Sequence, residues 1–235
     1  MINKFKKIYF RILLTLDYIL NNLFLNKLLI NNVKKRNNKL KFKINNIITL
    51  NRSIFYYEEE TLDWIETFNE EETFWDIGAC TGVYSIIASK KNLSSFAFEV
   101  DFPTYQICRK NIDINNLNNL CKVFNILIGE STELVNLDIN KIAGISKTPM
   151  INKKKDNKLM SYKLDDLVKL KGFDMPDYIK IDVERTEDKL FKGGHEFFRN
   201  EKIKSIMVEI SERNFTFINN FLEERNYELF KKYDQ

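Results

Sequence analysis

Short apolar runs alternate with helix-like segments along most of the chain after residue 72. The strand-like runs are TFWDI (73–77), SSFAFEV (94–100), KVFNILIG (122–129), DYIKIDV (177–183) and KSIMVEI (204–210). Segments with helical spacing lie between them, among them GVYSIIASKK, PTYQICRKNIDIN and TEDKLFKGGHEFFRN. Strands that alternate with helices are typical of βαβ units. The pattern therefore predicts an α/β fold, with a doubly wound, mostly parallel sheet and helices on both faces.

The alternation weakens between residues 130 and 177. The segment NKKKDNK (152–158) is a run of charged and polar residues, which is typical of a solvated loop. The segment LMSYKLDDLV (159–168) is compatible with an added strand that leads into a short helix.

The N-terminal segment has a different pattern. Residues 8–30 are strongly apolar but are interrupted by Arg11, Asp17, Asn21, Asn22, Asn26 and Lys27. The polar positions follow helical spacing, so we expect a basic amphipathic helix rather than a spanning one. Such a helix lies on an anionic membrane surface, or it docks on the protein's own core or on a second subunit. Residues 31–52, rich in Asn and Lys, indicate a linker. The expected organisation is a helical arm and linker over residues 1–52, followed by one domain over residues 53–235.

The charge is distributed unevenly along the 235 residues. The net charge is +4, yet residues 1–45 contain eleven Lys and Arg against one acid, which leaves −6 for the remainder. An acidic body without a recognisable reader motif makes a nucleic-acid partner unexpected, although the basic arm raises that possibility. Three cysteines without CxxC spacing argue against a disulfide framework and against structural zinc. We therefore expect a cytoplasmic protein, and residues 1–35 are the expected contact with the inner face of a membrane or with another subunit.

A glycine turn follows the first strand of the domain. Its sequence, DIGACTG, has the form D-x-G-x-x-x-G and includes Asp76, Gly78, Ala79 and Gly82. In doubly wound sheets, ligands bind at the carboxyl ends of the strands beside such turns. The spacing differs from the dinucleotide fingerprint G-x-G-x-x-G, and a carboxylate beside the turn would repel a pyrophosphate. The same carboxylate favours a ligand with an ammonium or sulfonium group.

A second acid ends the next strand. Glu99 lies 23 positions after Asp76, where a carboxylate typically accepts hydrogen bonds from the two ribose hydroxyls of an adenosine. Glu99 alone does not separate NAD from S-adenosylmethionine. Together the two acids favour S-adenosylmethionine, with Asp76 at its amino-acid end and Glu99 at its ribose.

The strand DYIKIDVE carries charges on one face. With period 2, Lys180, Asp182 and Glu184 share a face opposite Ile179 and Ile181. Charged groups at the end of a central strand are costly to bury unpaired, and such an end opens on the ligand crevice. We therefore expect a site here, with a Lys–carboxylate ion pair that has no chemical role as the alternative.

These segments together resemble the FkbM family of S-adenosylmethionine-dependent methyltransferases. The resemblance rests on FWDIGACTGVYSIIAS with FAFEVDFPTYQICRKNIDIN, on SYKLDDLV, on IKIDVERTEDKLFKGG and on KSIMVEI, and it covers about residues 53–230. It implies a class I methyltransferase fold and methyl transfer to oxygen, often on a sugar or polyketide hydroxyl. It also implies cofactor roles for Asp76, Gly78 and Glu99, and places Lys180, Asp182 and Glu184 around the transferred methyl group.

The chain departs from the family pattern at three places. Arg185 stands where the family usually has Gly, which puts the acceptor in doubt, and Val100 replaces a common Pro. The chain ends at Gln235, which leaves little room for a final antiparallel strand, so we expect an abbreviated sheet or an incomplete sequence.

Two mechanisms remain open for an O-methyltransferase. Asp182 or Glu184 acts as general base toward the acceptor hydroxyl, or Asp182 binds a divalent metal such as Mg²⁺ that acidifies it. The acceptor itself, a small molecule or a glycan, does not follow from the residues. The alternative functions are a non-catalytic methyltransferase-like binding module at a membrane and, less favoured by Asp76, a nucleotide-dependent dehydrogenase.

Overall fold

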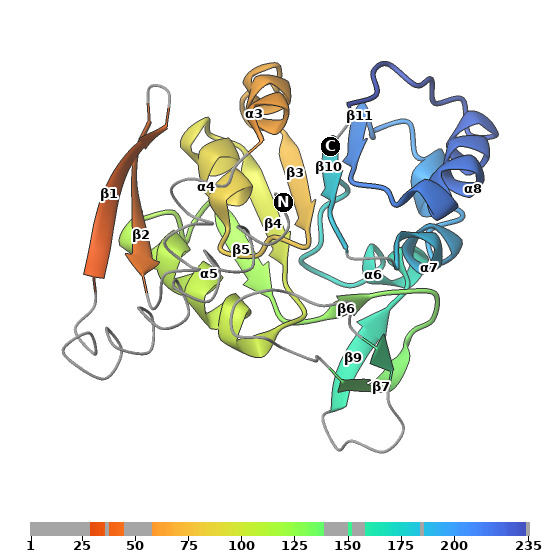
Figure 1. Ribbon diagram of the computed structural model, residues 1–235, viewed down its shortest axis with the longest axis horizontal. Coiled ribbons are helices and arrows are strands. Elements are labelled where there is room, and N and C mark those ends of the chain that lie inside the picture. The colour runs from red at the N-terminus through yellow and green to blue at the C-terminus, as the bar shows by residue number, and fades with distance from the viewer. Residues whose placement is uncertain are drawn as a thin grey trace, which may run out of the picture.

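A five-stranded parallel sheet forms the centre of the protein (Figure 1). The computed structural model describes residues 29–35, 38–44, 58–138, 150–151, 158–183 and 186–233. The sheet order is β11-β10-β3-β4-β5, and every neighbouring pair is parallel. Its strands are β3 (Thr73–Ile77), β4 (Ser94–Phe98), β5 (Cys121–Phe124), β10 (Tyr178–Ile181) and β11 (Ser205–Val208). The predicted parallel sheet is confirmed, and β3 and β10, which carry the candidate site residues, lie next to each other within it.

Helices cover both faces of this sheet, as predicted. One face packs against α3 (Glu59–Glu66), α4 (Val83–Lys90) and α5 (Phe102–Ile114), and the other against α6 (Leu164–Leu167), α7 (Glu187–Lys192), η1 (Phe197–Arg199) and α8 (Glu212–Glu223). The strands alternate between the two cores: Phe74 and Tyr178 belong to the first, whereas Trp75 and Ile179 belong to the second. This period of 2 places Asp76 and Lys180 on the first face, where they are in register as neighbours on β3 and β10.

The described part of the segment expected to be a linker, residues 31–35 and 38–44, belongs to a β-hairpin. Strand β1 (Leu29–Lys35) pairs antiparallel with β2 (Asn38–Ile44), and the hairpin lies beside α5 (Figure 1). Leu40 and Phe42 of β2 have no exposed surface and belong to the same core as α4 and α5. Burial of these two side chains explains why the segment is ordered despite its Asn- and Lys-rich composition.

The predicted amphipathic helix falls almost entirely on residues 1–28, which lie outside the described residues. Its last two positions, Leu29 and Ile30, begin β1. Contact of the arm with a membrane or with a second subunit stays a prediction. Within the part of the chain that the structure describes, no helix combines the length and the apolar character needed to cross a bilayer.

A smaller sheet projects from the carboxyl side of the central one. Its order is β6-β9-β7-β8, formed by β6 (Leu127–Ile128), β7 (Glu133–Asp138), β8 (Met150–Ile151) and β9 (Lys158–Tyr162). The added strand predicted around residue 160 is β9, and the short helix after it is α6. The expected single strand over residues 122–129 is divided into β5 and β6, because the amide of Asn125 donates to the carbonyls of Glu99 and Val100 and turns the chain out of the central sheet.

The aspartates of the LDDL segment hold this smaller sheet and α6 against the C-terminal half. One carboxylate oxygen of Asp165 accepts the backbone N–H groups of Glu196 and Phe197, at 3.0 and 2.7 Å. Asp166 accepts the hydroxyl of Thr132 at 2.8 Å. The segment therefore has a structural role in this chain. Among the described residues, the central sheet has no antiparallel strand after β11, and residues 227–233 form no helix or strand.

Candidate active site

The glycine turn between β3 and α4 has three residues in the left-handed region of backbone conformation. The φ angles of Gly78, Cys80 and Gly82 are +89°, +51° and +82°. The N–H groups of Gly78 and Ala79 both donate to the carbonyl of Phe98, at 2.9 and 3.0 Å, which ties the turn to the end of β4. This conformation explains the two glycines of the motif, because residues with a Cβ rarely adopt it.

Gly78 also brings the turn into contact with the end of β10. A Cβ atom at this position would lie 1.9 Å from the backbone oxygen of Asp182, and the N–H of Asp182 donates to the carbonyl of Ile77 at 2.9 Å. The glycine motif and the acidic strand, about a hundred residues apart in sequence, therefore meet at one point. The absence of a side chain at Gly78 is what allows them to meet.

Asp76 lies beneath the turn and completes the start of α4. Its side chain has no exposed surface, and its Oδ2 accepts the N–H of Ser85 at 3.2 Å and the Ser85 hydroxyl at 2.6 Å. Gly82, the N-cap residue, has no side chain to satisfy these first-turn donors, so Asp76 replaces the missing cap. Burial raises the pKa of Asp76 above its ordinary value, although Lys180 and Ser85 offset part of that rise.

The second oxygen of Asp76, Oδ1, is buried and has no hydrogen-bond partner among the described residues. An unpaired buried carboxylate oxygen is costly and is frequent where a ligand group is bound. The predicted contact of Asp76 with the ammonium end of a cofactor stays a prediction. The capping role was not predicted, although the serine three positions after Gly82 was visible in the sequence.

Glu99 also contacts the turn. Its Oε2 accepts the N–H of Cys80 at 2.9 Å and its Oε1 accepts the N–H of Asp101 at 2.8 Å. The side chain is 8% exposed, so it lies at the boundary between the protein and the space in front of the turn. The two oxygens of a carboxylate can accept hydrogen bonds side by side, which is the geometry that a vicinal diol such as ribose requires.

Lys180 and Asp182 form an ion pair at the end of β10. The Lys180 Nζ lies 3.0 Å from Asp182 Oδ2, and the lysine side chain is 3% exposed whereas that of Asp182 is 34% exposed. Burial alone would lower the pKa of Lys180, but the carboxylates of Asp182 and Asp76 outweigh it and raise this pKa above its ordinary value. Lys180 therefore carries a positive charge at the carboxyl end of β10, and this charge holds the carboxylate of Asp182 in place.

Tyr84 completes this cluster and was not predicted. The Lys180 ammonium lies 5.0 Å from the centre of its ring, and the Tyr84 hydroxyl accepts the N–H of Glu58 at 2.9 Å. Its position in α4, two residues after Gly82, places it beside the turn. Nothing in the sequence around Tyr84 distinguished it from an ordinary aromatic residue of a helix, so its contact with Lys180 could not be predicted.

The structure brings together the predicted residues Asp76, Gly78, Lys180 and Asp182, and it places Glu99 on the same turn through Cys80. Ala79 and Gly82 form the turn itself, as expected. Glu184 and Arg185 lie outside the described residues, so the predicted role of Glu184 and the effect of Arg185 stay predictions.

The surroundings of Asp182 bear on the predicted metal. No group of three metal-ligating side chains occurs among the residues that the structure describes. The partner of Asp182 is an ammonium group, and a second cation on the same carboxylate would be repelled by it. This donor set suits an organic ligand better than Mg²⁺. A nucleoside cofactor remains compatible with the site, since a buried unpaired oxygen of Asp76 and the carboxylate of Glu99 lie at the same turn.

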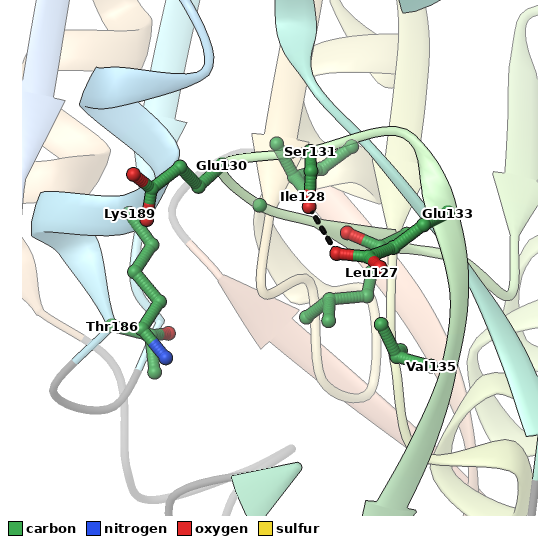
Figure 2. A pocket seen from close by; sticks show the side chains of 10 residues that line it. Leu127, Ile128, Glu130, Ser131, Glu133, Val135, Thr186 and Lys189 are labelled. Carbon is green, nitrogen blue, oxygen red and sulfur yellow. Dashed lines mark hydrogen bonds between the residues drawn. The ribbon is translucent and has the colours of Figure 1, made fainter.

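A pocket of about 390 Å³ lies between the smaller sheet and the start of α7 (Figure 2). Its floor is apolar, with Leu127, Ile128 and Val135, and hydroxyl and charged groups line the rest. Figure 2 shows Thr186 and Lys189 on one side and the Ser131–Glu133 hydrogen bond on the other. Thr186, four residues after Asp182 in sequence, is one of the lining residues, whereas Asp182 and the residues of the glycine turn are not.

The chain is similar in sequence or in structure to several known proteins. A protein of Methanocaldococcus jannaschii described as uncharacterized is 35% identical over 52 residues, which are 22% of this chain and 20% of that protein. A crystal structure of a methyltransferase FkbM from Methylobacillus flagellatus KT matches with 21% identity and a TM-score of 0.43, over 59% of this chain and 33% of that chain. The M. jannaschii TYW2 protein in complex with AdoMet matches with 16% identity and a TM-score of 0.46, over 87% and 77%.

The chain thus spans about a third of the FkbM structure it matches and a fifth of the curated relative. The sequence profile described as the methyltransferase FkbM domain matches residues 76–229, which include the glycine turn, Glu99, the Lys180–Asp182 pair and α8. The predicted doubly wound fold, a parallel sheet with helices on both faces, is confirmed, and the family match disfavours the alternative of a dehydrogenase. The chain belongs to the FkbM methyltransferase family.

Proposed function

We propose that this protein transfers a methyl group from S-adenosylmethionine to a hydroxyl oxygen of a small-molecule or glycan acceptor. The observation that supports this most is the Lys180–Asp182 ion pair, in which a buried ammonium holds a partly exposed carboxylate against the cofactor turn. A carboxylate in that position can accept the proton of an alcohol, which an acceptor oxygen must lose when it is methylated.

The cofactor is held by the turn and by Glu99 in this proposal. When bound, S-adenosylmethionine supplies a methyl group on a positively charged sulfur. Glu99 accepts the ribose hydroxyls, and the N–H of Cys80 keeps its carboxylate at the edge of the turn. Gly78 and Gly82 let the turn pack closely against the backbone of Asp182 and the side chain of Cys108, which fixes the shape of the turn that the cofactor meets. Asp76 supports the turn from beneath by holding the start of α4.

Asp182 acts as the general base. Its Oδ2 is fixed by Lys180, so in this assignment Oδ1 accepts the hydroxyl proton of the acceptor. The fixed orientation matters because methyl transfer is an in-line displacement, in which alignment at about 3–3.5 Å supplies much of the rate.

The acceptor binds in the pocket between the smaller sheet and α7. Its volume of about 390 Å³ and its combination of an apolar floor with hydroxyl groups suit a polyhydroxylated ring that has one apolar face. The carboxylates of Glu130 and Glu133 disfavour a phosphorylated acceptor and disfavour RNA. A neutral, hydroxyl-rich molecule therefore fits the pocket best.

The test compares Asp182→Asn with Asp188→Asn, a control carboxylate in the first turn of α7 that pairs with Lys192 on the surface. The acceptor source is a pool of glycans and metabolites from cells that lack the gene, and the readout is transfer of label from tritiated S-adenosylmethionine. We expect Asp182→Asn to lose about 100-fold or more in rate while its cofactor affinity stays near that of the wild type. Asp188→Asn keeps full activity. Full activity in Asp182→Asn removes Asp182 from the mechanism, and no labelled product with any pool contradicts the proposal.

A further inference from the structure

Asn111 of α5 and Asn115, the C-cap residue of that helix, bind the edge of strand β2 that faces the helix. Asn111 Oδ1 accepts the N–H of Lys43 at 2.7 Å, and one helical turn later Asn115 Oδ1 accepts the N–H of Lys41 at 3.0 Å. Both asparagines are buried, with exposures of 0% and 5%. Their amides take the place of a neighbouring strand along β2, because a buried strand edge must find partners for its N–H groups.

The other ends of the two amides differ. Asn111 Nδ2 donates to the carbonyl of Thr81 at 2.8 Å, and Thr81 belongs to the glycine turn. Asn115 Nδ2 returns to the carbonyls of Lys41 and Asn111, at 2.7 Å each, and does not reach the turn. Asn111 alone of these two side chains therefore joins the hairpin directly to the turn.

The turn is sensitive to such a contact at Thr81. This residue lies between Cys80 and Gly82, whose φ angles are both in the left-handed region. A turn of this kind persists only where its surroundings fix it, and the Asn111 hydrogen bond fixes the carbonyl at its centre. The hairpin end of Asn111 is itself anchored, since Leu40 and Phe42 on either side of Lys41 have no exposed surface.

We propose that Asn111 is a positioning residue for the cofactor turn and couples docking of the β1–β2 hairpin to the binding of S-adenosylmethionine. The inference rests on the assignment of that cofactor to the turn. When the hairpin is docked, the Lys43 N–H holds one end of the amide and the other end holds Thr81 in the conformation that the cofactor meets. The coupling is reciprocal: cofactor that favours this turn also favours the docked hairpin.

Calorimetry with S-adenosylmethionine on the full chain tests the first half of this inference. The variants are Asn111→Ala and the matched control Asn115→Ala. The control also removes a buried amide, which lies at the end of the same helix and bonds the same strand. We expect Asn111→Ala to raise the cofactor Kd by about tenfold, whereas Asn115→Ala changes it by less than about twofold even where it lowers stability as much. Equal changes in Kd for the two variants overturn the inference.

A second pair of variants acts from the hairpin side and leaves both asparagines intact. Lys43→Pro removes the N–H that holds Asn111, and Lys41→Pro removes the one that holds Asn115. We expect only Lys43→Pro to weaken cofactor binding. Equal Kd values for these two variants overturn the coupling even where Asn111→Ala fails to fold.

Hydrogen exchange gives the reciprocal readout. We expect S-adenosylmethionine to slow amide exchange in residues 38–44 of the wild type, Asn111→Ala to abolish this slowing and Asn115→Ala to retain it. Cofactor binding without slower exchange in the hairpin contradicts the coupling but leaves the proposed function standing. A wild-type protein that does not bind S-adenosylmethionine overturns both.

Discussion

Replacement of Gly78 by alanine tests how the cofactor turn and the acidic strand depend on each other. The new Cβ would lie 1.9 Å from the backbone oxygen of Asp182, although real contacts of this kind essentially never fall below 3.0 Å. The two segments must therefore separate by at least about 1.1 Å. That movement would also break the hydrogen bond from the Asp182 N–H to Ile77, which is now 2.9 Å long.

The energetic cost has three parts. An alanine at positive φ costs about 1–2 kcal/mol, the lost hydrogen bond about 0.5–1.5 kcal/mol and the overpacking about 1–3 kcal/mol. We expect Gly78→Ala to lower the free energy of unfolding by about 3–6 kcal/mol. Because Asp182 itself is displaced by about 1 Å, we also expect a loss of about 100-fold in methyl transfer.

Gly172→Ala is the matched control. Its φ is +99°, and a Cβ there would meet no atom within 4 Å, so it carries the backbone strain without the contact. We expect it to cost only about 1–2 kcal/mol and to keep its activity. Denaturant unfolding and a cofactor-dependent transfer assay measure both variants. Equal destabilisation by the two substitutions, with activity retained in Gly78→Ala, would refute the inferred contact between the turn and Asp182.

Three further predictions follow from the described contacts. At pH 8, iodoacetamide should modify Cys80 alone, because burial raises the pKa of the Cys108 thiol and raises that of Cys121 to about 12. Bound S-adenosylmethionine should slow the modification of Cys80. Peptide mass spectrometry measures the labelling, and equal labelling of Cys108 speaks against this prediction. Phe42→Ala should cost about 3–5 kcal/mol of unfolding free energy, since the side chain is fully buried, and a cost below about 1 kcal/mol would show that the hairpin is not part of the core. EDTA should leave the transfer rate unchanged, and a loss that added Mg²⁺ restores would favour the metal mechanism over Asp182 as general base.

The central sheet was predictable because its strands carry a local signal. Buried parallel strands have apolar residues on both faces, and TFWDI and YIKI became β3 and β10 with only Asp76 and Lys180 as charged exceptions. Those two exceptions lie at the candidate site. An acid or an amine in the middle of an apolar run is costly, so a sequence shows it clearly.

The hairpin was not predicted, for a physical reason. Residues 39–43 read KLKFK, and this alternation is a strand signal, but the Asn- and Lys-rich surroundings concealed it. Besides the burial of Leu40 and Phe42, a pair of asparagine amides about 70 residues further along the chain stabilises β2, and no local pattern reveals that partner. Likewise, the break between β5 and β6 depends on contacts from Asn125 to Glu99 and Val100, which form only in the folded chain.

The strands by which the chain enters and leaves the smaller sheet lie side by side. Its first strand, β6, and its last, β9, pair with each other in parallel, so the chain leaves the central sheet and returns to it at neighbouring points. The chain between β5 and α6 is therefore an excursion whose two ends lie side by side, with Ile128 anchoring it in the core of the second face. Under the proposed function, this excursion contributes most of the acceptor pocket, whereas the glycine turn and Glu99 belong to the central sheet, so the two halves of the site lie on separable parts of the chain.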